Sequence, residues 1–259
     1  MRIIILLCLI VTSFGITYAG DPFAGKKILD LTYVFNKDTI YWPTAKGFTH
    51  EKVAWGKSDA GYWYTSANYS ASEHGGTHLD APIHFGENAW TSAQIPVDRF
   101  IGAVSVIDVT ERCAANSDYQ MSVEDIKAWE TKNGPLSEGA IVFMRTGWGK
   151  YWPNRKKYLG DDKPGDASNL HFPGYSKAAA EFLVKERKIK GVGIDTASID
   201  PGNSKDYIAH QVFNSANVYG LENVANMDRL PEKGATIIAL PMKIEDGTGG
   251  PVRIIAIVD

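Results

Sequence analysis

The chain has 259 residues, of which 44% are hydrophobic and 22% are charged, and its formal net charge is −3. This is the composition of an ordinary globular protein that is long enough to bury a sizeable core. A sequence pI near 6.1, without a basic stripe interleaved with aromatic residues, argues against nucleic acid as a partner.

The N-terminus has the pattern of a secretory signal peptide. A basic Arg2 precedes an apolar run, and the small-residue site at 17–19 predicts cleavage after Ala19. A retained membrane anchor is the alternative, but the run is shorter than the roughly 18 to 20 residues that cross a bilayer. We therefore expect residues 1–19 to be a signal peptide and residues 20–259 to form a single domain of a secreted protein without a membrane anchor.

Two strands are predicted before residue 71, at residues 26–35 and 63–69, where large apolar and β-branched side chains are concentrated. Asn68 opens an Asn-x-Ser glycosylation sequon, which a chance match explains at least as well. Four aromatic residues could line an aryl pocket, although core packing is the commoner role of such side chains: Trp55, Trp63, Tyr64 and Trp90.

The segment "SEHGGTHLDAPIHF", residues 72–85, holds three of the six histidines. Its three histidines and its aspartate all stand at even-numbered positions, and alternate side chains of a strand share one face. The odd-numbered positions from 75 to 83 are small or apolar and suit a core. The two glycines at 75 and 76 disfavour a helix, and Pro82 should end the strand in a loop. The polar side chains expected on one face are His74, His78, Asp80 and His84.

Imidazole nitrogens and a carboxylate that converge from one short segment suit a borderline divalent cation such as Zn²⁺ or Mn²⁺. The alternative is that these are separate surface histidines, or core histidines with ordinary partners. Four polar groups on one face of an otherwise apolar and glycine-rich strand favour the metal site.

The rest of the chain alternates between buried strands and helices. Residues 102–110 and 139–148 are continuous apolar runs typical of strands buried on both faces. Between them, residues 122–134 predict a helix that opens at Ser122 with a near capping box. Further elements are a helix at 176–191 closed by Gly191, a strand at 191–195, and two buried strands at 234–242 and 252–258, with a turn at 246–250. This order predicts an α/β or α+β fold with a mixed sheet that can curve into a barrel.

Three histidines lie outside the cluster. His50 and His171 have no acidic neighbours in the sequence, so surface or structural roles are expected for them. His210 has Glu222 twelve residues further on, which alone is a weak indication of a site.

The stretch "HGGTHLDAPIHF" resembles the H-x-G-T-H-x-D-x-P-x-H signature of the cyclase family of metal-dependent hydrolases, which includes bacterial kynurenine formamidases and isatin hydrolases. The resemblance continues through "MRTGW", "GIDTASIDP", "AHQ" with the later glutamate, and "IALPMKIEDGTGGPVR". It therefore covers nearly all of the expected mature chain.

The resemblance implies an α/β fold of the swivelling β/β/α type, with a curved, barrel-like sheet flanked by helices and a homodimer or higher homo-oligomer. It assigns the first metal to His74, His78 and Asp80, with Asp80 able to bridge to a second. His210 and Glu222 match ligands of that second metal, so one or two Zn²⁺ or Mn²⁺ ions per chain are expected. A further histidine, His84, matches the catalytic residue.

The implied reaction is hydrolysis of a small aromatic amide. An arylformamidase would release formate from N-formylkynurenine, whereas an isatin hydrolase would open a lactam to isatinate. "IKAWE" and "GLENVANMDRLPEKGA" resemble the isatin hydrolase branch, but Glu222 favours the formamidase branch, which we expect here. A secreted binding protein that retains the fold without catalysis is the non-enzyme alternative, and the complete set of ligands with His84 argues against it.

Joint metal binding by His210 and Glu222 requires the chain to fold back between them. An unbroken helix would hold them some 18 Å apart at 1.5 Å per residue. We therefore expect the helix after residue 210 to end before Gly220, with Gly220 in the left-handed conformation that follows many helices.

Overall fold

The computed structural model describes residues 23–258. The predicted signal peptide lies outside the described residues. Within residues 23–258, no helix is long and apolar enough to cross a membrane.

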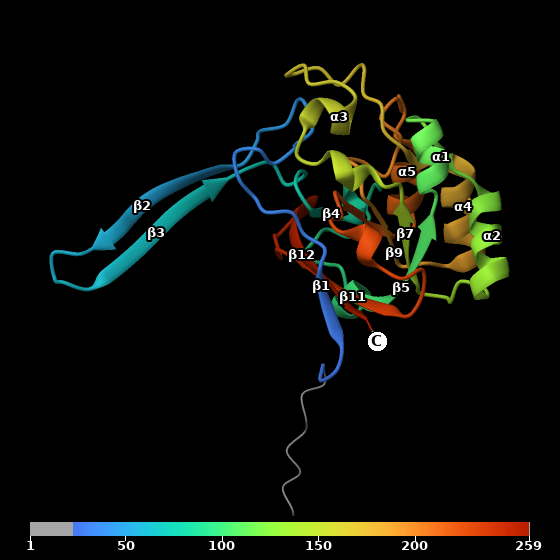
Figure 1. Cartoon of the computed structure of the whole chain (residues 1–259), viewed down its shortest axis with the longest axis horizontal. Coiled ribbons are helices and arrows are strands. Elements are labelled where there is room, and N and C mark those ends of the chain that lie inside the picture. The colour runs from blue at the N-terminus through green and yellow to red at the C-terminus, as the bar shows by residue number, and fades with distance from the viewer. Residues whose placement is uncertain (1–22, 259) are drawn as a thin grey trace, which may run out of the picture.

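A closed barrel of mixed strands forms the centre of the molecule (Figure 1). Within residues 23–258 the main sheet has eight strands in the order β1-β12-β11-β5-β7-β9-β10-β4, and β4 also pairs with β12, so that every strand except β1 belongs to a closed ring. The bounds are β1 Lys27–Asp30, β4 His78–Asp80, β5 Ile101–Asp108, β7 Ile141–Arg145, β9 Gly191–Ile194, β10 Tyr219–Glu222, β11 Ala235–Pro241 and β12 Gly249–Val258. The expected α/β fold with a barrel-like sheet is confirmed.

The α-helices cover one side of this barrel. Strands β5, β7, β9 and β10 run parallel to one another, and their outer faces pack against helices in an apolar layer separate from the barrel interior. The helices are α1 Thr110–Ala115, α2 Val123–Asn133, α3 Arg155–Leu159, α4 Lys177–Arg187 and α5 Ile208–Ser215. The smaller elements are β6 Gln120–Met121, β8 Gly174–Tyr175, and the 3₁₀ turns η1 Pro82–His84, η2 Val97–Phe100, η3 Trp148–Tyr151 and η4 Met227–Arg229. The prediction of strands buried on both faces is correct for this half.

The opposite side of the barrel has no such cover. In Figure 1 no α-helix of the described chain lies over β1, β12 and β11. Burial in β11 and β12 therefore alternates, with Ile237 and Ile254 buried inside the barrel while Leu240 and Arg253 are exposed outside. The prediction that both strands are fully buried is wrong for their outer faces.

A two-stranded ribbon, formed by β2 Thr49–Lys57 and β3 Trp63–Ser70, projects from the body of the molecule (Figure 1). The predicted strand at 63–69 is confirmed, but the aromatic residues of the ribbon are exposed and do not line the cavity beside the histidine cluster. The exposed fraction is 57% for Trp55, 65% for Trp63 and 53% for Tyr64. Of the four aromatic residues, Trp90 packs against the barrel core.

The predicted helix at 122–134 is confirmed as α2, since Ser122 and Asp125 form both halves of a capping box and Gly134 follows with φ 85°. Helix α4 ends earlier than expected. Lys188 adopts the left-handed conformation, and Ile189 is then buried, so Gly191 opens β9 and does not close the helix. The first strand is also shorter than predicted, because the Asp30 carboxylate accepts the Thr32 N–H and the chain turns.

Candidate metal centre

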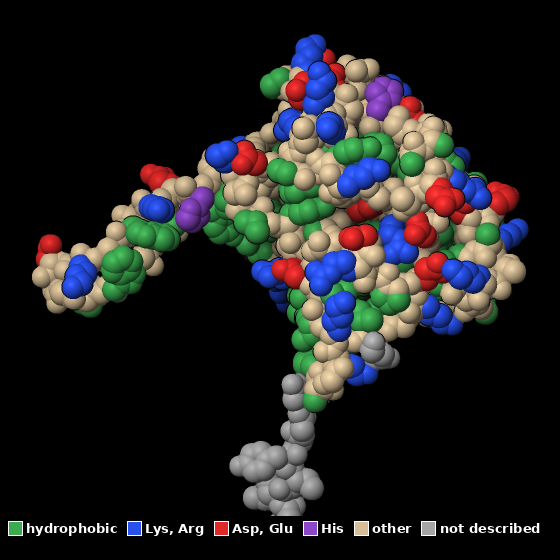
Figure 2. All heavy atoms as spheres, in the orientation of Figure 1, with side chains coloured by type: hydrophobic (Ala, Val, Ile, Leu, Met, Phe, Trp, Pro, Cys, Tyr) green, Lys and Arg blue, Asp and Glu red, His purple; other side chains and the backbone are tan. Residues whose placement is uncertain are grey.

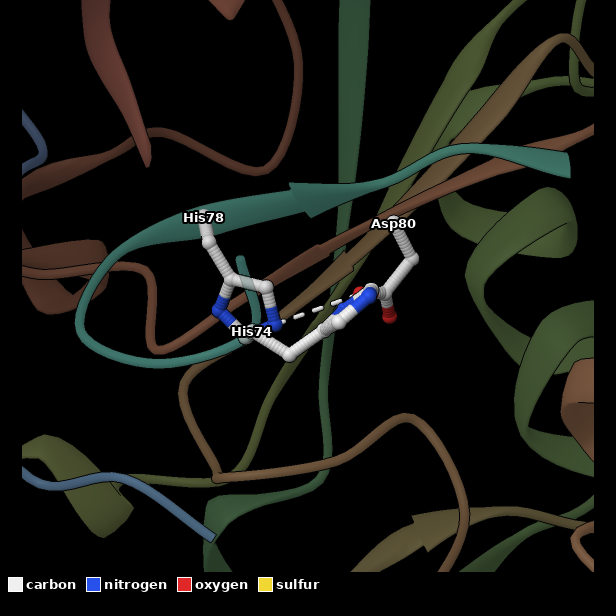
Figure 3. A group of neighbouring side chains, drawn as sticks. All are labelled: His74, His78 and Asp80. Carbon is white, nitrogen blue, oxygen red and sulfur yellow. Dashed lines mark hydrogen bonds and ion pairs between the residues drawn. The ribbon is translucent and has the colours of Figure 1, made fainter. Parts of the chain in front are cut away.

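The centre is built on β4, which lies between β10 and β12 where the barrel closes. His78 and Asp80, two residues apart, extend to one side of this strand, while Leu79 between them is fully buried in the barrel core. Figure 3 shows the side chains of His74 and His78 converging on Asp80. The expected alternation is therefore correct across β4.

The sequence analysis predicted that the four polar side chains of the segment share one face of a strand. This prediction is wrong for His74 and His84, because β4 contains only His78 and Asp80. His74 precedes a turn at Gly75 and Gly76, and Gly76 has φ 59°. A β-carbon on Gly75 would lie 2.0 Å from the ring of Tyr41, so only glycine lets these two segments approach. His74 thus reaches Asp80 through a turn.

His84 enters the cluster from the other end of the segment. It closes the 3₁₀ turn that begins at Pro82, and this turn folds its ring back over the site. The ring centroids of His84 and His74 are 3.8 Å apart and nearly parallel, and His210 lies 5.7 Å from His84.

His210 and Glu222 are brought together by the expected reversal of the chain. Helix α5 ends at Ser215, and the Glu222 Oε1 atom lies 3.3 Å from His210 Nε2. The prediction that Gly220 takes the left-handed conformation is wrong. Asn217 takes it, with φ 56°, whereas Gly220 is part of β10 opposite Asp80. A β-carbon on Gly220 would approach the Asp80 carboxylate to 3.3 Å, so its lack of a side chain leaves room for that group.

Two sets of ligand atoms share Asp80. His74, His78 and Asp80 form one set, and Asp80, His210 and Glu222 form the other, with the ligand atoms of each set within 4.8 Å of one another. All but His74 are buried. The arrangement offers room for one divalent cation, or for two that Asp80 bridges.

Hydrogen bonds outside the cluster fix the tautomers of two histidines. His78 Nδ1 donates to the Gly76 carbonyl at 2.9 Å, and His210 Nδ1 donates to the Asp200 carboxylate at 2.7 Å. Each Nε2 atom therefore faces the carboxylates of the cluster, where it can donate a proton to them or, when deprotonated, bind a cation. The buried Nε2 of His78 has no hydrogen-bond partner among the described residues and lies 3.2 Å from Asp80 Oδ1, which is the environment of a metal ligand.

A third histidine is oriented by a relay of two residues. The Thr248 hydroxyl donates to Glu73, so it accepts the Nε2–H of His74 at 2.8 Å. Nδ1 of His74 then points at Asp80 Oδ1, 2.6 Å away. Three imidazole nitrogens thus face one buried carboxylate.

The shifted pKa values of His78, Asp80 and Glu222 show that the cluster is stabilised by positive charge beside its two buried carboxylates. Burial opposes protonation of His78, yet the charges of Asp80 and Glu222 raise its pKa to about 9. Burial and the neighbouring charge of Asp80 raise the pKa of Glu222. Burial also works against ionisation of Asp80, but the surrounding imidazoles hold its pKa well below the usual range. Protons or a cation must supply the positive charge, and these donor atoms suit Zn²⁺ or Mn²⁺.

A cavity of about 430 Å³ opens beside the cluster. This volume suits a small aromatic molecule. Its aromatic walls come from Tyr41, Trp42, Phe85 and Tyr207, none of which the sequence had indicated.

The residues that orient the histidines were also missed. Asp200 lies in "GIDTASIDP", Glu73 directly precedes His74, and Thr248 lies in the predicted turn. The sequence offered one signal for them, namely the position of Glu73 next to the histidine cluster. Thr248 could not be found in this way, because its contact with His74 exists only in the folded chain.

His50 and His171 lie outside the centre: His50 stacks on Phe48, and His171 pairs with Asp118.

Fold and site together define a metal-dependent hydrolase. The chain belongs to the Cyclase family, whose model matches residues 29–201. It is 38% identical over 195 residues to an isatin hydrolase of Roseibium aggregatum, covering 72% of each chain. It is 28% identical over 230 residues to a kynurenine formamidase of Bacillus cereus, covering 88% of this chain and 95% of the relative. Isatin hydrolase A from Labrenzia aggregata, bound to benzyl benzoate, superposes with a TM-score of 0.83 at 36% identity, covering 91% of this chain and 94% of that one.

The relay through Thr248 should control metal affinity. We expect Thr248→Val to weaken metal binding by about 10- to 100-fold, the usual effect of losing a partner that orients a ligand. Thr248→Ser keeps the hydroxyl and should bind metal as the unmodified protein does. Titration against a competing chelator measures both affinities, and equal affinity in the valine variant would show that the relay does not support His74.

Proposed function

We propose that the chain hydrolyses the C–N bond of a small aromatic amide at a centre of one or two divalent cations. His74, His78 and Asp80 would hold a first cation, and Asp80, His210 and Glu222 would hold a second. The observation that carries this proposal is the convergence of three imidazole nitrogens on the buried Asp80 at the wall of an aromatic cavity.

A bound divalent cation lowers the pKa of water toward about 7 and polarises the substrate carbonyl. The chain's own residues supply the remaining functions. Burial lowers the pKa of His84, so its imidazole is neutral in the resting site and has an unprotonated ring nitrogen. We assign it the role of accepting a proton from the attacking water. Placed over His74, the ring can pass that proton to the departing nitrogen. Phe85 and Tyr207 exclude water and orient the aryl ring.

Opening of an isatin-like lactam is the reaction we place first. The sequence alone had favoured a formamidase because of Glu222. The relatives support the lactam more strongly, since identity is 38% to an isatin hydrolase and 27–28% to the kynurenine formamidases.

Hydrolysis of an aryl formamide such as N-formylkynurenine is the second candidate, and one observation favours it. Glu222 is buried in the centre, with Oε1 3.3 Å from His210 Nε2 and Oε2 3.4 Å from His78 Nε2. A glutamate in this place supports a second cation, as the family resemblance implies for formamidases.

We also propose that the enzyme acts outside the cytoplasm, since residues 1–19 match a signal peptide.

A binding protein without catalysis would not need a neutral His84 beside a complete set of metal ligands.

Side-by-side assays test the substrate. Purified protein should turn over isatin with a higher kcat/KM than N-formylkynurenine, and removal of metal by chelation should abolish both activities. Full activity in metal-free protein would overturn the proposed chemistry, and a clear preference for the formamide would reverse the order of the two substrates.

His84→Ala should lower kcat by about 100-fold or more, because general acid–base catalysis contributes 10²–10⁴ in rate. Bound metal should stay unchanged, as measured on the same sample by elemental analysis. His171→Ala is the matched control, since His171 lies outside the centre and pairs with Asp118. Loss of metal from His84→Ala would instead make His84 a ligand.

Glu222 decides between one cation and two. Metal-replete protein should hold close to two cations per chain, and Glu222→Ala should hold about one with a large loss of formamide hydrolysis. A stoichiometry of one that this substitution leaves unchanged would contradict the binuclear centre and favour a mononuclear lactam hydrolase.

A further inference from the structure

The hydroxyl of Tyr41 is a buried polar group that has no hydrogen-bond partner among the described residues. Tyr41 is 3% exposed and belongs to the wall of the cavity beside the metal centre. A buried hydroxyl without a partner destabilises the folded chain, so such groups are rare in native proteins. A molecule that enters the cavity is therefore the candidate partner of this hydroxyl.

The backbone around Tyr41 holds its ring against the segment that carries His74. Tyr41 forms an antiparallel bridge with Gly75, and the N–H of Gly76 donates to the carbonyl of Ile40 at 2.9 Å. Three ring carbons of Tyr41 lie within 2.5 Å of the place where a β-carbon on Gly75 would stand. The ring is thus fixed beside the residue that follows His74, at the wall of the cavity.

Other buried tyrosines show what Tyr41 lacks. The hydroxyl of Tyr175 lies 3.0 Å from the carbonyl oxygen of Gly193, and that of Tyr158 lies 2.9 Å from Oδ1 of Asn223. These two hydroxyls are bonded within the fold, whereas the donor of Tyr41 is unused. Burial raises the pKa of Tyr41 to about 12, so the hydroxyl keeps its proton at neutral pH.

The cavity offers a substrate no positively charged lysine or arginine. Figure 2 shows such side chains spread over the surface of the body, but none is among the described residues that line the cavity. Two carboxylates, those of Asp80 and Glu222, do line it. A substrate with a carboxylate tail would therefore lose water without gaining a counter-charge from the cavity walls.

The two candidate substrates share one acceptor besides the carbonyl under attack. Isatin and N-formylkynurenine both carry a keto group on the ring carbon next to the one that bears the amide nitrogen. We call this group the ortho keto group. Its oxygen has two lone pairs and can accept the hydrogen bond that a tyrosine hydroxyl donates.

We propose that the Tyr41 hydroxyl donates a hydrogen bond to the ortho keto group of the substrate. This inference rests on the proposed function and names the substrate class of the same site, namely an uncharged aryl amide with a ketone ortho to its nitrogen. The keto group supplies the partner that Tyr41 lacks in the fold. A substrate anchored at this second point is held in one orientation, which favours reaction.

A matched pair of substrates tests the contact. Formanilide and N-(2-acetylphenyl)formamide differ only in the ortho keto group with its methyl. In the metal-replete enzyme, Tyr41→Phe should lower kcat/KM about 10-fold more for the acetyl compound than for formanilide, the usual effect of one lost hydrogen bond. Tyr175→Phe is the matched control and should change both values alike. An equal effect of Tyr41→Phe on both substrates would overturn the proposal.

Binding of the released amines separates this contact from catalysis. Tyr41→Phe should bind 2-aminoacetophenone about 10-fold more weakly than the unmodified protein does, while the affinity for aniline stays the same in a ligand-observed NMR titration. If this difference is found in a protein that hydrolyses no amide, the proposed function fails and the contact stands. If amides are hydrolysed but both amines respond alike, the contact fails and the proposed function stands.

Thermal unfolding shows whether the hydroxyl has a structural role. Tyr175→Phe should lower Tm, because the hydroxyl of Tyr175 is bonded within the fold. Tyr41→Phe should leave Tm unchanged or raise it, because it removes a buried polar group without a partner. An equal fall in Tm for the two variants would give the Tyr41 hydroxyl a partner inside the protein and overturn the proposal.

The charge of the substrate is tested by a second pair. N-formylkynurenine differs from N-(2-acetylphenyl)formamide in its charged amino-acid tail, and both carry the ortho keto group. The uncharged compound should have the higher kcat/KM, because the described cavity walls offer the tail no lysine or arginine. A clear preference for N-formylkynurenine would overturn the uncharged substrate class.

Discussion

The buried carboxylate of Asp80 is the group on which the rest of the site depends. It is almost fully removed from solvent, and histidine nitrogens approach both of its oxygens. A carboxylate in such surroundings is stable only when positive charge is close to it. The outer hydrogen bonds of the histidines are arranged so that a cation can supply that charge.

The fold explains why these groups meet. Asp80 belongs to the short strand that completes the barrel, with Gly220 and Gly249 opposite it on the neighbouring strands. Both glycines leave space for the site, since a β-carbon on Gly249 would lie 2.8 Å from the ring of His74. The seam of the barrel is therefore the place where polar side chains can enter an otherwise apolar interior.

The sequence allowed much of this to be predicted, because local patterns determine much of the architecture. The apolar runs located the barrel strands, the capping box located α2, and the alternation around Leu79 placed His78 and Asp80 on one side. Contacts between distant segments could not be predicted in this way. Thr248 reaches His74 only after folding, and the aromatic residues of the cavity come from separate loops and turns.

The exposure of the ribbon was missed for a related reason. Alternating large residues at 63–69 indicate a strand, but they do not show whether that strand joins a sheet or projects from it. Trp55 and Trp63 look like core residues in a sequence, and only the tertiary structure shows that no core of the described chain receives them.

The position of the centre at the seam has a consequence for the stability of the fold. Strand β4 is three residues long, so few backbone hydrogen bonds join it to its neighbours. A cation held by Asp80, His210 and Glu222 would act as a cross-link between segments far apart in the sequence, much as a disulfide does. The described residues include a single cysteine, the buried Cys113, so this ionic cross-link would take the place of a covalent one.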